Sequence, residues 1–481
     1  MTEHICEVCE RIFKQKGHLD AHKRRKKPCK KDAKLEAIVE KKVQAALTKK
    51  KLEISIDQKD TAIDYTTKTR EELIALCKEK KIKGYSSKKK EDIIKLLLDT
   101  YPKKETIVET IIPKQSDDDY VYQTMITCIG NKRKLVKNIR KVVEEVRILL
   151  SKERLNIVDG FAGSSVVSRE LSYIADKIYS NDLEYYAYLM ASCFLIKPDS
   201  EQREKIEAHI KIMNDIAEHG PFIEGIISRL YAPKDTKNIR EGERCFYTRE
   251  NALIIDTLRD YIEKKVEDDI KNYCLVPLLT KASIHTNTAG VFKGFYKKGK
   301  IGHFGGKGEF ALSRITKPIS VEVPIWSDLE FTAYPSNKDI NTLVSDLPDD
   351  IDLMYLDPPY NQHPYGSNYF MLNVIATNKE PDNISNVSGI PADWNKSSYN
   401  TRSSAVTSMN HLISTGIEKS RYLLISYNNE GIITEDDWKT LLEPYIVKKY
   451  EIQYDTFKAC RNLKNRSNKV VEIMYLVSKK V

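Results

Sequence analysis

The residues best suited to chemistry stand in a short loop, LDPPYNQHPYGSNYF, which follows an apolar run ending at Asp357. The Asp357 carboxylate and the Pro358 carbonyl are two hydrogen-bond acceptors, and the proline nitrogens carry no hydrogen, so the loop is stiff. Two acceptors at a fixed separation suit an amino group with two N–H bonds. The Tyr360 ring offers an aromatic face on which a planar base can stack. The loop therefore predicts a site for the amino group of an unstacked base.

The amino nitrogen of adenine is a poor nucleophile because its lone pair is delocalised into the ring. We hypothesise that Asp357 and the Pro358 carbonyl hold both amino hydrogens out of the ring plane, which restores electron density on the nitrogen. That nitrogen can then attack a methyl sulfonium in line. This chemistry needs no metal.

A second segment, DGFAGSS from Asp159 to Ser165, follows the apolar run LNIVD and precedes a helical pattern. Small residues at a strand-to-helix turn let backbone N–H groups approach an anionic ligand. Alone this signal is weak, because glycine-rich turns of this kind bind many nucleotides. Asp182 ends the next apolar run, KIYSND, and Lys132 stands upstream in ITCIGNKRKL.

Together these segments resemble the Dam-type adenine-specific DNA methyltransferases of the alpha group, whose signature is DPPY. Asp159–Ser165 is similar to the family's D-x-F-x-G-S-G loop, which cradles the methionine part of S-adenosylmethionine, although Ser165 stands where the family usually has Gly. Gly130–Lys132 is similar to its G-[GNS]-K element, and Ser426–Asn428 to a strand end that lines the same pocket.

The resemblance implies a cofactor, S-adenosylmethionine, and a role for each matching residue. Lys132 would pair with the cofactor carboxylate, and Asp182 would bind the ribose hydroxyls. The catalytic residues implied are Asp357, Pro358, Pro359 and Tyr360. The cofactor-binding residues implied are Lys132, Asp159, Phe161, Gly163, Ser164, Asp182 and Asp357.

The order of the motifs implies the place of target recognition. The Lys132 element comes first, then the Gly163 loop, a long insert, and Asp357 last, which in the alpha group places target recognition at about 200–340. Inside it, HTNTAGVFKGFYKKGKIGHFGGKG mixes lysines with aromatic residues and glycines, which suits contacts with DNA. Lys293 and Lys297 are the DNA-binding candidates there.

The first segment, residues 1–30, is typical of a small zinc-binding domain. Its candidate ligands are Cys6, Cys9, His22 and Cys29. Two cysteines on a knuckle and a histidine on the following helix can converge on one tetrahedral zinc ion. Over the first three ligands the segment resembles a CCHH-type zinc finger, but Cys29 stands in place of the second histidine, which predicts a CCHC finger.

A charged helical linker is expected at 31–61. Residues 62–101 resemble a SAP-type helix–turn–helix DNA-binding module, with Thr69 and Glu72 as a capping box for its first helix. Lys88 and Lys89 are its candidate phosphate contacts. A generic helical hairpin that binds protein is the alternative. Residues 102–119 read as a second linker.

The elements that must position the chemistry belong to an α/β domain at 120–481. Apolar runs at 155–159, 177–182, 351–357 and 421–428 have loops at their carboxyl ends and helical patterns between several of them. The tail alternates like a closing pair of strands. This pattern predicts a mostly parallel, doubly wound sheet, which the resemblance identifies as the Rossmann-like sheet of S-adenosylmethionine-dependent methyltransferases with an inserted target-recognition subdomain.

Net charge is concentrated at one end of the chain. Residues 1–100 carry 27 Lys and Arg against 17 Asp and Glu, whereas the remaining residues carry 52 of each. The whole net charge of +10 therefore lies in the first 100 residues, as expected of a polyanion-binding module attached to a neutral body. We expect double-stranded DNA as the partner.

Composition excludes several classes of protein. With 41% hydrophobic and 31% charged residues the chain is neither disordered nor collagen-like. It has no apolar run of about 18 residues and no secretory leader, so we expect no membrane span and an intracellular location, in cytoplasm, nucleus or a viral replication site. Six scattered cysteines favour a reducing compartment: Cys77, Cys128, Cys193, Cys245, Cys274 and Cys460.

Three other functions are compatible with the sequence. They are methyl transfer to the cytosine amino group, methylation of RNA, and DNA binding without catalysis by a methyltransferase domain that has lost its activity, of which Ser165 in place of Gly would be the first sign. The first is disfavoured because that branch more often has Ser in place of Asp357. By resemblance, the biological role is the modification part of a restriction–modification pair, with a cognate endonuclease as a possible partner. A monomer is favoured.

Overall fold

The computed structural model describes residues 130–306, 310–455 and 469–480 without gaps. Before them it describes residues 4–5, 12–13, 69–79, 88–100 and 119–123 and the single positions 85, 126 and 128. The chain divides into two compact units, Met1–Glu105 and Thr106–Val481.

The unit Met1–Glu105 contains two helices, α3 (Arg70–Glu79) and α4 (Lys90–Thr100). The predicted capping box is present, because the Thr69 N–H donates to Glu72 Oε2 at 2.7 Å and the Glu72 N–H donates to Thr69 Oγ1 at 3.3 Å. The two helices bury a small shared core made of Leu73, Cys77, Ile93 and Leu97. The predicted helical pair is thus confirmed as an element of structure.

Two short antiparallel strands, β1 (His4–Ile5) and β2 (Ile12–Phe13), are also described in this unit. The predicted zinc ligands Cys6, Cys9, His22 and Cys29 all lie outside the described residues. So does the linker predicted at 31–61.

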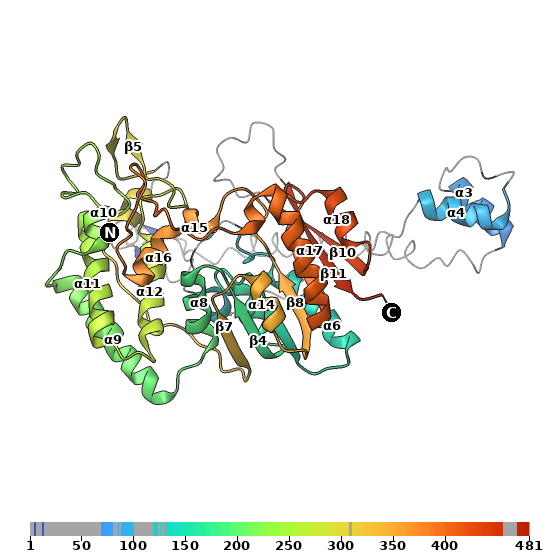
Figure 1. Cartoon of the computed structure of the whole chain (residues 1–481), viewed down its shortest axis with the longest axis horizontal. Coiled ribbons are helices and arrows are strands. Elements are labelled where there is room, and N and C mark those ends of the chain that lie inside the picture. Colours follow the sequence, from blue (N-terminus) through green and yellow to red (C-terminus); the bar gives the residue numbers. More distant parts are fainter. Residues whose placement is uncertain are drawn as a thin grey trace, which may run out of the picture. The chain divides into compact units, whose positions relative to one another are not determined.

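A seven-stranded sheet forms the centre of the unit Thr106–Val481 (Figure 1). Its order is β10-β11-β9-β8-β3-β4-β7, with β11 antiparallel to both neighbours and every other pair parallel. The strands are β3 (Leu155–Asp159), β4 (Ala175–Asn181), β7 (Thr332–Ser336), β8 (Ile351–Leu356), β9 (Ser420–Asn428), β10 (Ile446–Asp455) and β11 (Lys469–Ser478). The predicted mostly parallel sheet and its closing antiparallel pair are confirmed.

Strand β7 was not expected from the sequence. It lies at the edge of the sheet, paired only with β4 among the described strands, and it contains Pro335. A proline removes a ladder hydrogen bond and is tolerated at an edge, so a strand containing one is hard to recognise from sequence. Residues 332–336 therefore belong to the central sheet rather than to the inserted region.

Helices cover both faces of the sheet, because residues alternate between faces along each strand. Leu353 and Tyr355 of β8 pack into one core, and Met354 and Leu356 pack into the other. One face carries α5 (Asp119–Tyr122), α6 (Val136–Leu149), α7 (Val166–Leu171) and part of α8 (Tyr185–Leu195). The other carries α14 (Ile340–Asp346), α17 (Arg402–Lys419) and α18 (Glu435–Leu442).

The region between α8 and β7 forms a second, mainly helical layer that gathers at one end of this unit (Figure 1). Its long helices share a hydrophobic core with α8 and with α16 (Phe370–Thr377), which follows the Asp357 loop. Its elements are α9 (Ser200–His219), α10 (Ile226–Leu230), α11 (Arg249–Lys265), α12 (Lys271–Ile284), β5 (Lys297–Lys298), β6 (Ile301–Gly302) and α13 (Ala311–Thr316). After β8 come α15 (Tyr365–Asn368), α16 (Phe370–Thr377) and the short 3-10 helix Ser398–Asn400.

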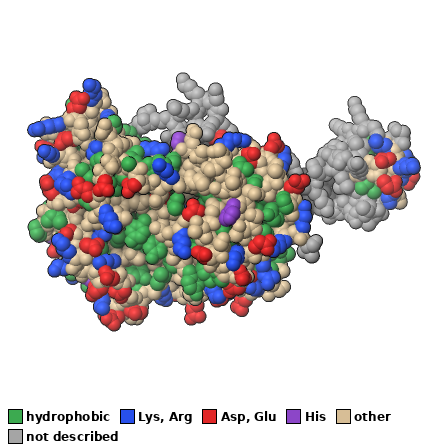
Figure 2. All heavy atoms as spheres, viewed as in Figure 1, with side chains coloured by type: hydrophobic (Ala, Val, Ile, Leu, Met, Phe, Trp, Pro, Cys, Tyr) green, Lys and Arg blue, Asp and Glu red, His purple; other side chains and the backbone are tan. Residues whose placement is uncertain are grey.

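Acidic and basic side chains are interspersed over the visible face of the unit Thr106–Val481 (Figure 2). This mixture agrees with the equal numbers of acidic and basic residues after residue 100. None of the helices that the structure describes has the length and apolar character needed to cross a membrane.

Candidate active site

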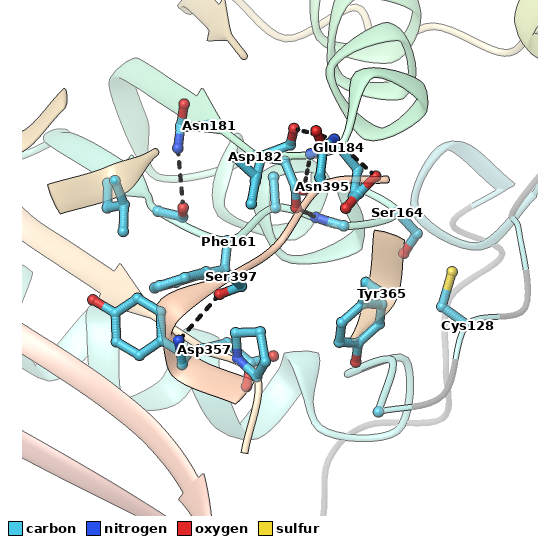
Figure 3. A pocket seen from close by; sticks show the side chains of 18 of the residues that line it. Cys128, Phe161, Ser164, Asn181, Asp182, Glu184, Asp357, Tyr365, Asn395 and Ser397 are labelled. Atoms are coloured by element: carbon cyan, nitrogen blue, oxygen red, sulfur yellow. Dashed lines mark hydrogen bonds between the residues drawn. The ribbon is translucent and has the colours of Figure 1, made fainter. Parts of the chain in front are cut away.

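A cavity opens where four parallel strands end, which is where open α/β sheets bind ligands (Figure 3). Each of β3, β4, β7 and β8 contributes the residues that directly follow it or end it. The wall includes Lys132, Gly160–Ser164, Asn181–Glu184, Lys338–Ile340, Asp357, Pro359, Tyr365, Gly366, Asn395, Ser397, Tyr399 and Asn400. The sheet order therefore brings together three motifs that are far apart in the sequence.

Asp357 is held by an ion pair with Lys132, whose ammonium Nζ lies 2.6 Å from Asp357 Oδ1. The same ammonium donates to the Gly130 carbonyl at 3.4 Å and lies 3.2 Å from Glu472 Oε1 of β11. Asp357 Oδ2 has no hydrogen-bond partner among the residues that the structure describes. One oxygen of the Asp357 carboxylate is thus fixed, and the other is left as an acceptor on a residue that lines the cavity.

The charges of this cluster act on one another strongly because all three groups are buried. Burial raises the pKa of Asp357 to about 6; the Lys132 charge opposes that rise and the Glu472 charge adds to it. Burial lowers the pKa of Lys132, but the charges of Asp357 and Glu472 outweigh burial and hold that pKa well above its usual value. Lys132 is therefore an ammonium, and Asp357 is ionised at neutral and basic pH.

The Tyr360 ring lies beside Lys132, which lines the cavity, and packs on Tyr427. Its ring packs edge-to-face on Tyr427 at 6.0 Å between centroids, and Lys132 Nζ lies 5.6 Å from its centroid. The wall contains Pro359 and the ring of Tyr365, but neither Pro358 nor Tyr360. Tyr365, stacked on Tyr369 at 5.8 Å, is one of the aromatic residues of the wall, together with Phe161, Tyr186, Tyr355 and Tyr399.

The hydroxyls of these two tyrosines converge on Gly130. A Cβ on Gly130 would lie 2.8 Å from the Tyr360 hydroxyl and 2.9 Å from that of Tyr365, closer than real contacts allow. Gly130 also has a φ of +78°, which favours glycine. The glycine of the G-N-K element therefore lets the chain pass close to the Asp357 loop.

The glycine-rich loop lies on the cavity wall from Gly160 to Ser164. Gly163 has a φ of +52°, and a Cβ there would meet no atom within 4 Å. Ser165, which stands where the resembling family has glycine, adopts the left-handed conformation that glycine favours, with a φ of 59°. The serine thus keeps the turn geometry of a glycine.

Asp159 lies beneath this loop and is not part of the cavity wall. Its Oδ2 accepts a hydrogen bond from Ser168 Oγ at 2.6 Å, and its Oδ1 is buried with no hydrogen-bond partner among the described residues. Burial raises the pKa of Asp159 to about 7, opposed by the Ser168 hydroxyl and reinforced by the charges of Asp357 and Asp182. The structure therefore places Asp159 as a support of the loop.

Asp182 joins the loop to the end of β4. Its Oδ2 accepts the Gly163 N–H and its Oδ1 accepts the Glu184 N–H, both at 2.8 Å. Glu184 Oε2 accepts from Asn373 at 2.6 Å and from Asn395 at 3.2 Å. Figure 3 shows Asp182, Glu184 and Asn395 meeting at one side of the cavity.

Acceptors therefore dominate this side of the cavity, as the binding of ligand hydroxyls requires. Burial raises the pKa of Glu184 to about 7, and the Asp182 charge adds to that rise. Elsewhere on the wall, Asn400 donates from Nδ2 to the Asn361 carbonyl of the Asp357 loop at 2.7 Å, and its buried Oδ1 has no partner in the described part of the chain.

The DNA-binding candidates of the inserted region are exposed. Lys293 and Lys297 both lie at the surface, and Lys297 begins β5, which pairs with β6 in a short hairpin. Lys297 Nζ lies 4.8 Å from the centroid of the Phe295 ring. In the other unit Lys88 and Lys89 are exposed and directly precede α4.

Sequence reasoning missed several residues of the site. Glu472 was missed because a glutamate in an alternating strand is expected to face solvent. Lys338 and Asp339 were missed because they follow β7, the strand that carries Pro335. Asn395, Tyr399 and Asn400 come from a polar segment with no motif; the only available signal was its density of Asn and Ser after the Asp357 loop.

A family model described as D12 class N6 adenine-specific DNA methyltransferase matches residues 129–441 of the chain. This span contains Lys132, the glycine-rich loop and Asp357. A second family model, described as Rho termination factor, N-terminal domain, matches residues 64–106, which contain α3 and α4.

Curated relatives agree with the first match. The type II methyltransferase M.CviAII of Paramecium bursaria Chlorella virus 1 is 31% identical over 321 residues, or 66% of this chain and 87% of that protein. The type II methyltransferase M.NlaIII of Neisseria lactamica is 27% identical over 367 residues, or 73% and 98% of the two chains. The type II methyltransferase M.FokI of Planomicrobium okeanokoites is 25% identical over 370 residues, or 73% and 52%.

Proposed function

Because the chain belongs to the D12 class N6 adenine-specific DNA methyltransferases, we propose that it transfers a methyl group from S-adenosylmethionine to the amino group of an adenine flipped out of duplex DNA. The observation that carries this proposal is the Asp357 carboxylate, which lines a cavity at the strand ends and has one oxygen left as an acceptor. A base inside a duplex cannot reach that oxygen, so the target must leave the stack at a cost of a few kcal/mol.

The cavity fits the cofactor that this reaction uses. Open space lies beside Gly163, where a Cβ would meet nothing within 4 Å, so the loop backbone can approach a ligand. The Asp182 and Glu184 carboxylates supply acceptors for ribose hydroxyls, and the Phe161 and Tyr399 rings, 5.3 Å apart and edge-to-face, supply an apolar wall for a purine. When bound, S-adenosylmethionine supplies an electrophilic methyl group on a positively charged sulfur.

The chain's own residues hold and orient the target. Asp357 Oδ2 accepts a hydrogen bond from one N–H of the target amino group, and the Pro358 carbonyl is the proposed acceptor for the other N–H. The Tyr360 ring is the proposed stacking surface for the flipped base, and the Tyr365 ring, which lines the cavity, lies near it at Gly130. Closure of the pocket around the base replaces the stacking lost from the duplex.

The test uses purified protein, S-adenosylmethionine with a labelled methyl group, and duplex DNA. The wild-type protein should label adenine at its amino nitrogen, and Asp357→Ala should lower the rate by about 100-fold or more, as loss of one preorganised group does in other enzymes. Asp349→Ala, which removes an exposed carboxylate paired with Lys419, is the control. If Asp357→Ala transfers methyl as fast as the wild type, the assignment of this site is wrong.

For the biological role, we propose the modification part of a restriction–modification system, acting as a monomer inside the cell on the site of a cognate endonuclease. The relatives named as type II methyltransferases and modification methylases support this role. Sequencing of DNA from cells that express the protein should show adenine methylation confined to one short sequence. Methylation scattered over unrelated sequences would contradict it.

Target recognition is proposed for the inserted region at about 200–340, with Lys293 and Lys297 as DNA contacts. For the first unit we propose a SAP-like, DNA-binding helical pair at 62–101 and a CCHC zinc finger at 1–30. The charge of +10 in residues 1–100 supports both.

The finger should give about one zinc ion per chain by metal analysis. Cys29→Ser should lower that value, and Cys245→Ala, at a buried cysteine of the other unit, should not. Equal zinc content in both variants would exclude Cys29 as a ligand.

A further inference from the structure

Glu472 is a buried carboxylate to which the reaction assigns no role. It stands near the start of β11 with 1% of its surface exposed. Its Oε1 accepts a hydrogen bond from Ser426 Oγ at 2.6 Å and lies 3.2 Å from Lys132 Nζ. Since burying a charge is costly unless it is paired, a carboxylate at this position needs a reason beyond packing.

We propose that Glu472 is a positioning residue for methyl transfer: it directs the Lys132 ammonium onto Asp357 Oδ1, which leaves Asp357 Oδ2 for the target amino group. This inference rests on the proposed function. It assigns to β11, the antiparallel strand of the sheet, a part in aligning the acceptor at the end of β8.

The geometry of the ammonium supports this role. A lysine ammonium has three N–H donors, and three acceptors of the chain surround Lys132: Asp357 Oδ1, the Gly130 carbonyl and Glu472 Oε1. Ser426 of β9 fixes the Glu472 oxygen in turn. Two hydrogen bonds and one ion pair thus hold the ammonium against Asp357 Oδ1.

This arrangement also bears on the role that the resemblance implies for Lys132. An ammonium that already lies within 3.4 Å of three acceptors of the chain is held by the chain rather than by the cofactor carboxylate. Loss of Glu472 should therefore act on the rate of methyl transfer and spare cofactor affinity. Loss of a residue that binds the cofactor would instead lower cofactor affinity and spare the rate of methyl transfer.

The charge of Glu472 also acts on Asp357, so its removal should change the pH dependence of activity, which a purely structural role for Glu472 would not do. Removing a nearby negative charge lowers the pKa of a carboxyl group, so neutralising Glu472 should extend activity to lower pH. The other titratable groups that act on Asp357 remain in the variant: Lys132, Asp159, Tyr355, Tyr360 and Tyr365. The Glu472 charge also raises the pKa values of Lys132, Tyr355 and Tyr360, so these fall as well when it is removed.

The experiment compares Glu472→Gln and Glu472→Ala with a matched control, Glu170→Gln. Glu170 is also a fully buried glutamate paired with cations, at 2.9 Å from Lys137 Nζ and 3.3 Å from Arg140, but it does not line the cavity. Single-turnover rates are measured from pH 5 to 9, cofactor affinity is measured by calorimetry, and thermal unfolding reports stability.

Glu472→Gln keeps an acceptor for Ser426 and Lys132, so its rate at pH 8 should stay within about 3-fold of wild type while its acid limb moves down by about one pH unit. Glu472→Ala should lower kcat by about 10-fold or more with cofactor affinity changed by less than about 3-fold. Glu170→Gln should lose stability without moving the acid limb.

An acid limb of Glu472→Gln that stays in place or moves up would overturn the inference. So would a loss of cofactor affinity in Glu472→Ala as large as its loss of kcat, or a wild-type rate in both variants. If Glu472→Ala does not fold, the pH profile of Glu472→Gln decides. A wild-type protein that transfers no methyl group to DNA would instead overturn the proposed function.

Discussion

Four carboxyl groups of the site have raised pKa values: that of Asp357 is about 6, those of Asp159 and Glu184 are about 7, and that of Asp182 lies above its usual value. Burial is the first cause in each case. A carboxyl group whose pKa is higher in the folded chain than in the unfolded chain, where that of Asp is about 3.9, stabilises the fold at low pH. That stability is lost as the pH rises through the folded-state value. The site is therefore least favourable to folding at the pH where Asp357 is ionised and active.

Asp159 is a residue at which the loss of folding stability caused by a buried, ionised carboxylate can be measured. Asp159→Asn removes the buried charge, so at pH 8 the variant should be more stable than the wild type by on the order of 2 kcal/mol. At pH 5 the wild-type group is protonated, and the difference should shrink. Urea unfolding at both pH values is the measurement, with Asp176→Asn at an exposed position of β4 as the control. Equal stabilisation at both pH values would show that ionisation of Asp159 is not the cause.

Gly163 links the shape of the loop to cofactor affinity. Gly163→Ala should lower stability by about 1 kcal/mol because a left-handed φ is costly for alanine, and it should weaken cofactor binding because the new methyl group enters the open space of the cavity. Gly299→Ala is a matched control, since Gly299 also has a left-handed φ, +61°, with nothing within 4 Å, but does not line the cavity. Calorimetric titration should find weaker binding only for Gly163→Ala.

At the scale of elements, apolar runs were enough to find most of the sheet. The runs at 155–159, 177–182, 351–357 and 421–428 form β3, β4, β8 and β9. Strands buried on both faces read as continuous hydrophobic segments, which is why these were clear. The edge strand β7 was hidden by Pro335.

The residues of the site also fall into those that the sequence predicted and those that it did not. Residues in motifs at strand ends were found, since the sequence around Asp357 or Gly163 carries its own signal. Glu472 belongs to no motif, and its role depends on a contact with Lys132 across the fold. The stacking role expected of Tyr360 stays a prediction, and its contact with Tyr427 of β9 is one that nothing in the sequence shows.

The β5–β6 hairpin carries an element-scale prediction. Replacing Lys293 and Lys297 together by Gln should weaken DNA binding and lower the slope of log affinity against log salt by about 2, one for each lysine that no longer neutralises a phosphate. Cofactor affinity should not change. Lys264→Gln, which removes an exposed lysine on α11 that pairs with Asp260, is the control. An unchanged slope in the double variant would place the DNA contacts elsewhere.

At the scale of the molecule, the net positive charge and the candidate active site lie in different parts of the chain. Residues 1–100 carry the net charge of +10, and the rest of the chain, which contains the cavity, has as many acidic as basic residues. Affinity for any DNA and selection of one sequence can therefore reside in different parts of the chain.

Deletion of residues 1–104 tests this division. It should weaken DNA binding by about 10-fold or more at 0.15 M salt and flatten the salt dependence, because fewer basic groups then neutralise DNA phosphates. The methylated sequence should stay the same. Sequencing of DNA methylated by the two proteins is the measurement, and a changed target sequence would show that the first unit takes part in recognition.

The cluster of Lys132, Asp357 and Glu472 is assembled from the beginning, the middle and the end of the unit Thr106–Val481. During translation the glycine-rich loop and the DPPY loop are therefore synthesised long before β11. On the role inferred for Glu472, full activity begins only once translation has passed β11, which also supplies Met474 and Leu476 to one core of the sheet and Tyr475 and Val477 to the other.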